Sequence, residues 1–96
     1  MKPSITYHKN RAKIRAIVLS HNALNPRVFG SVLHGTDTES SDIDILVDTT
    51  PETSLFDIGA IHVELTELLG VKVDVLTPNA LPERWKQQVL KEAQPV

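Results

Sequence analysis

The sequence predicts a compact α/β domain in which a small mixed β-sheet is flanked by helices. Three observations lead to this prediction. Segments with helical periodicity alternate along the chain with short runs rich in β-branched residues. Glycine and proline fall between many of these segments and mark turns. The chain has 96 residues, which suffices for one hydrophobic core, so we expect a single domain over residues 1–96.

The N-terminal part predicts one helix and one short strand. Residues 1–8 show little pattern, and we expect them to be loosely ordered. From Lys9 to His21 apolar residues recur at helical spacing opposite a basic face, which predicts an amphipathic helix. That basic face is either solvated or contacts a phosphate or an acidic partner. Asn25-Pro26 predicts a turn, and Arg27–Phe29 predicts a short strand.

The middle of the chain predicts a strand followed by a helix. Apolar and β-branched residues predict the strand over about 42–47. Thr53 or Ser54 is expected to cap the helix, and Gly70 to end it. The apolar stripe of this helix comprises Leu55, Ile58, Ile61, Leu65, Leu68 and Leu69.

The C-terminal part repeats this order. Alternating residues predict a strand over 71–76, and Pro78-Asn79 predicts a turn. Pro82 suits the first turn of a last helix. The expected buried face of that helix comprises Trp85, Val89 and Leu90.

Asp42 and Asp44 stand one residue apart at the start of a predicted strand. Side chains i and i+2 of a strand point to the same face, so these carboxylates converge. Two ionised carboxylates repel each other, and a divalent cation relieves the repulsion. Mg²⁺ often binds one or two carboxylates together with substrate phosphates, so the pair predicts a magnesium site. The alternative is that one of these two aspartates caps a turn and the other is solvated. A further aspartate of this segment, Asp48, is predicted to lie at the end of the strand and not to bind the metal.

Gly30-Ser31 follows a predicted strand and opens a turn or short helix. Backbone N–H groups at a helix start favour a phosphate, and glycine lets a ligand approach closely. A Gly-Ser pair alone is a common turn. Together with Asp42 and Asp44 it indicates a site for a metal-bound nucleoside triphosphate. A P-loop is excluded, because Thr36-Asp37 stands where that motif requires Lys followed by Ser or Thr.

Asp74 is a third candidate ligand. It lies between Val73 and Val75 in a predicted strand, where aspartate is disfavoured unless it is paired or metal-bound. A third carboxylate near the first two would complete a two-metal site, which activates an attacking oxygen and stabilises the leaving group at phosphorus. Alternatively, Asp74 lies in solvent on an edge strand or pairs with Lys72.

Composition excludes several classes of protein. The net charge of −2 argues against nucleic acid as the main target. The absence of cysteine excludes a disulfide framework and a thiolate zinc site. No apolar run reaches the roughly 18 residues of a membrane span, and the N-terminus lacks the apolar core of a signal peptide. We therefore expect a cytoplasmic protein that does not act at a membrane.

Three segments together resemble the minimal nucleotidyltransferase (MNT) domains of the polymerase-β-like superfamily. They are Phe29-Gly30-Ser31, Ser41-Asp42-Ile43-Asp44 and Val73-Asp74-Val75-Leu76-Thr77-Pro78. The resemblance runs from about Asn25 to the C-terminus and implies the nucleotidyltransferase fold. In one departure, Val32-Leu33-His34 follows the serine here, whereas relatives often have Ala-Arg there.

The resemblance also implies roles for individual residues. Gly30 and Ser31 would hold the triphosphate of ATP. Asp42 and Asp44 would bind Mg²⁺, and Asp74 would complete the metal site and help to deprotonate the acceptor. The catalytic and metal-binding set implied for this chain is therefore Asp42, Asp44 and Asp74.

Many such proteins are encoded beside a HEPN-domain ribonuclease toxin and act as its antitoxin. Characterised members transfer AMP from ATP to a tyrosine of the toxin, a reaction called AMPylation. The resemblance thus implies a protein adenylyltransferase with a HEPN toxin as its partner. Two alternatives stay open: an antitoxin that occludes its partner without catalysis, and a nucleotidyltransferase for a small molecule or RNA. A homo-oligomer is also open.

Overall fold

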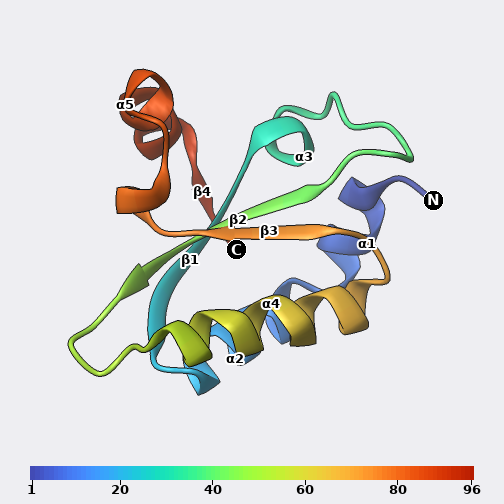
Figure 1. Ribbon diagram of the computed structural model, residues 1–96. Helices are drawn as coiled ribbons and strands as arrows, with labels where there is room; N and C mark the ends of the chain where they lie inside the picture. The colour runs from blue at the N-terminus through green and yellow to red at the C-terminus, as the bar shows by residue number, and fades with distance from the viewer.

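The computed structural model describes residues 1–96, and a four-stranded sheet forms its centre (Figure 1). The strands are β1 (Ala23–Phe29), β2 (Ile43–Thr49), β3 (Val73–Leu76) and β4 (Gln94–Pro95). Their order in the sheet is β3-β2-β1-β4. β1 runs antiparallel to β2 and β4, whereas β2 and β3 are parallel. The predicted small mixed sheet is confirmed.

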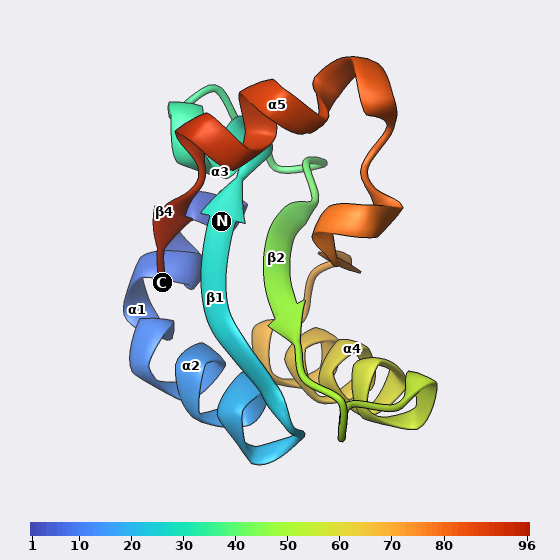
Figure 2. The ribbon, with the colours of Figure 1, turned by 90° about the vertical axis from the view of Figure 1, so that its left-hand side faces the viewer.

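Helices lie on both faces of this sheet. They are α1 (Pro3–Lys9), α2 (Arg11–Ser20), α3 (Gly30–His34), α4 (Leu55–Leu69), the 3-10 turn η1 (Pro78–Ala80) and α5 (Glu83–Glu92). α2 and α4 cover one face, and α5 lies over the opposite face (Figures 1 and 2). None of the helices combines the length and the apolarity that crossing a membrane requires.

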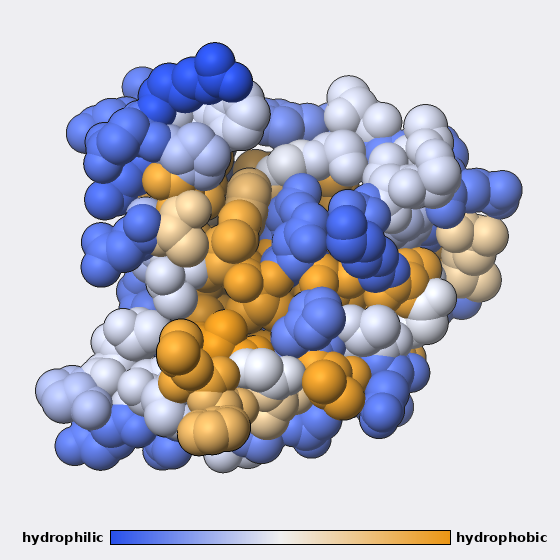
Figure 3. Space-filling model, viewed as in Figure 1, coloured by the Kyte–Doolittle hydropathy of each residue, from blue (hydrophilic) through white to orange (hydrophobic).

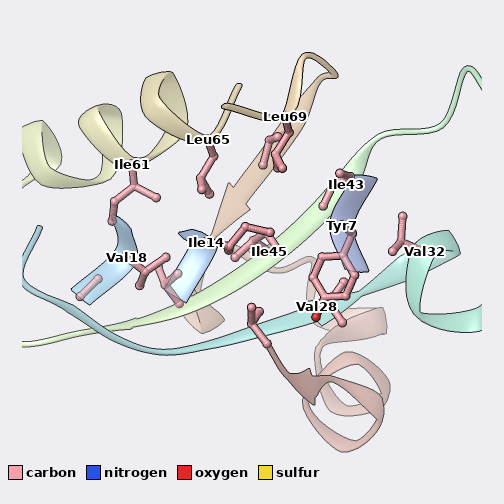
Figure 4. Packing of buried hydrophobic residues seen from close by; sticks show 14 residues of the cluster. Tyr7, Ile14, Val18, Val28, Val32, Ile43, Ile45, Ile61, Leu65 and Leu69 are labelled. Atoms are coloured by element: carbon pink, nitrogen blue, oxygen red, sulfur yellow. The ribbon is translucent and has the colours of Figure 1, made fainter. Parts of the chain in front are cut away.

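The main core lies between the sheet and α2 with α4. Ile43, Ile45 and Val47 alternate along β2, and all three side chains are fully buried there. Figure 4 shows Leu65 of α4 pointing toward Ile45 from the helix side. Burying one such side chain stabilises the fold by about 1.5–3 kcal/mol. This alternation therefore fixes which face β2 turns to the core.

A smaller core lies on the opposite face, under α5. It consists of Phe29, Leu46 and Leu81, with Val89 of α5 packed against it. Leu46 is out of phase with Ile45, so β2 is covered on both faces at this point. Asp44 is in phase with Leu46 and therefore belongs to the α5 face of the sheet.

Residues 1–8, expected to be loosely ordered, instead contribute most of α1. Pro3 suits the first turn of this helix, because its missing N–H is not needed there. Tyr7 is 2% exposed and packs in the main core. Contacts with distant parts of the chain, rather than a local pattern, order this segment. The predicted helix from Lys9 to His21 is confirmed as α2 over Arg11–Ser20, whereas Lys9 belongs to α1.

β1 is longer than predicted because the Asn25-Pro26 turn is absorbed into it. The pairing of β1 with β2 shifts register between Leu24 and Arg27, which marks a bulge. Asn25 has a φ of +52° there, and asparagine tolerates this left-handed conformation better than most residues. The Asn25-Pro26 pair, which predicted a turn, therefore marks the bulge in β1 instead.

α4 begins and ends as predicted. The Ser54 hydroxyl accepts a hydrogen bond from the N–H of Asp57, and the Asp57 carboxylate accepts one from the N–H of Ser54. Gly70 ends the helix in the left-handed conformation. Leu55, assigned to the apolar stripe, is instead 89% exposed, because the helix contacts the sheet only further along.

α5 is less buried than predicted. Trp85 is 51% exposed and Leu90 is 37% exposed, so only Val89 of the expected face packs against the smaller core. Figure 3 shows further hydrophobic atoms at the surface, in a band between α5 at upper left and α4 along the bottom. β3 crosses this region as an edge strand with no outer neighbour.

Candidate active site

Asp44 and Asp74 occupy directly paired positions on the parallel strands β2 and β3. Neighbouring strands lie about 4.8 Å apart, and paired residues of parallel strands project to the same face. The two carboxylates therefore lie side by side on the α5 face of the sheet. The sequence predicted that Asp74 lies near the first two acids, and the pairing of β2 with β3 places it beside Asp44.

Burial and two neighbouring carboxylates raise the pKa of Asp44 to about 6. Burial contributes most, because a desolvated carboxylate favours its neutral form. The negative charge of Asp74 and a hydrogen bond with it contribute next, followed by the charge of Asp42. Lys72 acts in the opposite direction. A proton thus relieves the repulsion between these acids, as a bound cation would.

Gly30 lies directly against the Asp44 carboxylate. Its φ is +74°, and a Cβ built on it would overlap with Oδ2 of Asp44. Phe29, the last residue of β1, is the register partner of Asp44, which explains this closeness. Ser31 follows in α3. The structure thus brings the predicted Gly-Ser pair next to the predicted acids.

Asp42 is held differently from the other two acids. Its Oδ2 lies 3.5 Å from Nζ of Lys72, and the two side chains are 35% and 70% exposed. Lys72 therefore pairs with Asp42 rather than with Asp74. No group of three or more His, Cys, Asp or Glu side chains is arranged to hold a metal ion. The three predicted ligands are neighbours, but they do not form a preassembled cage.

The donor set nevertheless fits a hard divalent cation. Every predicted ligand is a carboxylate oxygen, the type of donor that Mg²⁺ prefers. Two of the carboxylates are adjacent and repel each other, and the missing Cβ of Gly30 lets the Asp44 carboxylate lie directly against the Gly30 backbone. Mg²⁺ commonly takes its remaining ligands from water and substrate phosphates, so a preformed cage is not required.

Two other polar residues of this region have partners within the protein. Asp48 is bonded to Arg27 at 2.6 Å and to Asn25 at 3.0 Å, in keeping with the predicted strand-end role. His34, which follows the Gly-Ser pair where relatives often have arginine, contacts Glu92 of α5 at 3.0 Å through Nε2.

Sequence reasoning gave no role to Asp37, which the fold buries in the loop between α3 and β2. No local pattern marks this aspartate, because its partner lies in α1.

A cavity of about 130 Å³ lies near α1 and is lined by Tyr7, Arg11, Val32 and Gln94 among others. None of the three predicted acids lines that cavity. All three acids are half-buried.

Comparisons with known proteins show which family this chain belongs to. The family described as "Polymerase beta, Nucleotidyltransferase" matches residues 5–96. A relative from Methanocaldococcus jannaschii, named "putative protein adenylyltransferase", is 41% identical over 83 residues, which cover 86% of this chain and 89% of the relative.

Two solved structures share the fold. One, described as a "putative minimal nucleotidyltransferase", has a TM-score of 0.86 and 36% identity, covering 97% of this chain and 95% of that one. Another, a toxin–antitoxin structure with AMP-PNP, has a TM-score of 0.75 and 24% identity, covering 90% of this chain and 71% of that one. By family match, identity and fold, this chain belongs to the polymerase-β nucleotidyltransferase family, among its minimal nucleotidyltransferases.

Proposed function

We propose that this protein transfers AMP from ATP to a protein acceptor in an Mg²⁺-dependent reaction. The acceptor is a tyrosine of a HEPN ribonuclease toxin, and the protein acts as the antitoxin. The observation that carries the proposal is the pairing of Asp44 with Asp74 beside the bare backbone of Gly30. The adenylyltransferase name of the Methanocaldococcus relative supports a protein acceptor. The fold shared with a toxin–antitoxin structure containing AMP-PNP supports ATP and a toxin partner.

Each residue of the site has a role in this proposal. Gly30 and Ser31 hold the triphosphate, and the Gly30 backbone lies directly against the Asp44 carboxylate. Asp42 and Asp44 would supply oxygen ligands to Mg²⁺, and Asp42 is the one of the two that pairs with Lys72. When bound, Mg²⁺ neutralises charge on the triphosphate and on the paired acids. Asp74 completes the metal site and takes the proton of the acceptor hydroxyl.

The reaction is a displacement at phosphorus. The tyrosine oxygen attacks the α-phosphorus of ATP, and a new P–O bond forms. The bond between that phosphorus and the oxygen bridging to the β-phosphate breaks, and pyrophosphate leaves with the electron pair. The hydroxyl proton passes to Asp74. General-base help of this kind typically contributes 10²- to 10⁴-fold to a rate.

Calorimetry tests the nucleotide site directly. ATP is titrated with and without Mg²⁺ into the wild type, into Asp42→Asn/Asp44→Asn, and into Glu67→Gln, an exposed acid of α4 that serves as the control. We expect tight binding only with Mg²⁺, and a loss of roughly tenfold or more, about 1.4 kcal/mol, in the double variant. Equal affinity in every titration would refute the metal site.

Co-expression with the neighbouring HEPN protein tests the reaction and the biological role. We expect the intact mass of that partner to increase by one or more AMP units with the wild type. Asp74→Asn should retain most of the Mg²⁺–ATP affinity but lose the transfer. Neutralisation of toxicity by Asp42→Asn/Asp44→Asn at equal abundance, without any mass change in either case, would favour an antitoxin that only occludes its partner.

A further inference from the structure

Asp37 is the one charged side chain that the fold buries, with 5% of it exposed. It lies in the loop that joins Ser31 of α3 to Asp42. Its Oδ2 accepts a hydrogen bond from the backbone N–H of Ser4 in α1 at 2.8 Å. This bond lowers the pKa of Asp37, so the buried side chain is a carboxylate at neutral pH.

Asp37 supplies a hydrogen-bond acceptor to the N-terminus of α1, which has no side-chain cap of its own. The first N–H groups of a helix need acceptors, and negative charge is favoured at that end. Lys2, which precedes the helix, makes no side-chain cap, and the first turn holds no acidic residue. α1 has seven residues, too few to persist without tertiary contacts. The acceptor therefore comes from a loop 33 positions away.

The same bond anchors the loop. α1 is held from its other side by Tyr7, which packs in the main core near Val32 of α3 (Figure 4). The other contacts of the loop are exposed. Glu39 contacts the N-terminal amine at 3.3 Å, and in a small turn the Ser41 N–H donates to Thr38 O at 3.0 Å while the Ser41 hydroxyl accepts from Thr38 N–H at 2.9 Å. Asp42 follows that turn directly.

We propose that Asp37 is a positioning residue of the nucleotidyltransferase site. It fixes the loop between Gly35 and Asp42 on α1, and so sets the position of the Asp42 carboxylate relative to Ser31. This inference rests on the proposed function, in which both residues bind Mg²⁺–ATP. Asp44 and Asp74 lie in strands that Asp37 does not hold. Loss of the anchor therefore weakens nucleotide binding more than it lowers the rate at saturation.

Three variants test this role. Asp37→Ala removes the acceptor, and Asp37→Asn keeps an amide oxygen without the charge. Glu39→Gln is the matched control: Glu39 lies in the same loop and contacts the N-terminal amine at 3.3 Å, but it is 79% exposed, and such pairs contribute little. We expect Asp37→Ala to raise the Kd and the KM for Mg²⁺–ATP about fivefold or more, with a smaller effect on kcat. Asp37→Asn should be intermediate, and Glu39→Gln should match the wild type.

Hydrogen exchange of residues 35–42, measured without nucleotide, supplies a second readout. We expect faster exchange in Asp37→Ala and wild-type exchange in Glu39→Gln. If Asp37→Ala lowers the melting temperature but keeps the wild-type Kd and KM, Asp37 only caps α1 and the proposal is overturned. If the wild type binds no Mg²⁺–ATP, the proposed function fails instead, and exchange alone then decides: unchanged exchange refutes the anchor, and faster exchange supports it.

Discussion

Asp44 of β2 and Asp74 of β3 are register partners whose carboxylates share one face of the sheet, beside the backbone of Gly30. The fold thus places two acids where they repel each other. It holds them there through the buried residues that flank Asp44 in β2, Ile43 and Ile45. Because the pKa of Asp44 rises to about 6, protons and divalent cations compete for the same site near neutral pH.

We predict that Asp44→Asn stabilises the metal-free protein at pH 7.5. The pKa of Asp44 is 3.8 in the ordinary case and about 6 in the folded state. Between these values the folded state binds more protons than the unfolded state, so the free energy of unfolding falls as pH rises. A neutral amide removes this penalty, which solvent screening limits to about 1–2 kcal/mol.

Urea denaturation in EDTA, from pH 4 to pH 8, measures this difference. We expect the advantage of Asp44→Asn to be full above pH 6 and to shrink toward zero near pH 4. Added Mg²⁺ should stabilise the wild type at pH 7.5 but not the variant, because only the wild type gains a ligand. A variant no more stable than wild type at pH 7.5 would contradict the raised pKa.

Gly30→Ala is expected to abolish Mg²⁺–ATP binding, whereas Gly70→Ala should not. Both glycines have positive φ, so each alanine costs about 1–2 kcal/mol of stability. Around Gly70 nothing lies within 4 Å of an added Cβ, but at Gly30 the new methyl overlaps with Oδ2 of Asp44. The short Asp44 side chain can yield only by moving its carboxylate. Calorimetry and urea denaturation of both variants separate the two effects, and equal ATP affinity would contradict the close approach.

The ends of α4 and the closeness of Asp42 to Asp44 could be predicted from the sequence, because the residues that determine them are neighbours along the chain. Ser54 and Gly70 mark the ends of α4 within a few residues, and both marks are confirmed. The i, i+2 spacing of Asp42 and Asp44 predicted that the two acids lie close together, and the charge of Asp42 does act on Asp44, although β2 begins one residue after Asp42, at Ile43. In each case the interacting groups are neighbours along the chain, so a pattern can reveal them.

The rest depends on contacts that no local pattern encodes. α1 is ordered by Asp37 and by the burial of Tyr7, both contacts with distant segments. The adjacency of Asp74 to Asp44 depends on strand order, which alternation along the chain does not specify. Helical periodicity likewise grouped Trp85 with Val89, but of these two residues only Val89 packs against the small core under α5.

Lys72→Met should shift the pH dependence of Mg²⁺–ATP binding to higher pH. Lys72 lies 3.5 Å from Asp42, and its charge lowers the pKa of Asp44. Without that charge Asp44 holds its proton to a higher pH, and the proton excludes the cation. Lys91→Met, which changes an exposed lysine of α5, is the control. ATP titrations with Mg²⁺ from pH 5 to pH 8 give the midpoints. A midpoint shared by Lys72→Met and the wild type would show that Lys72 does not act on Asp44.

Leu65→Ala and Leu55→Ala form a matched pair on α4 that tests where the core lies. Leu65 is fully buried against the sheet, whereas Leu55, in the first turn, is 89% exposed. Removing a buried leucine forfeits its transfer free energy and leaves a cavity, so we expect Leu65→Ala to cost about 2–5 kcal/mol. Leu55→Ala should change stability by no more than about 0.5 kcal/mol. Both substitutions place the same residue in the same helix, so helix propensity cancels between them. Urea denaturation measures both, and a comparable loss for Leu55→Ala would mean that the start of α4 is covered in solution by something other than water.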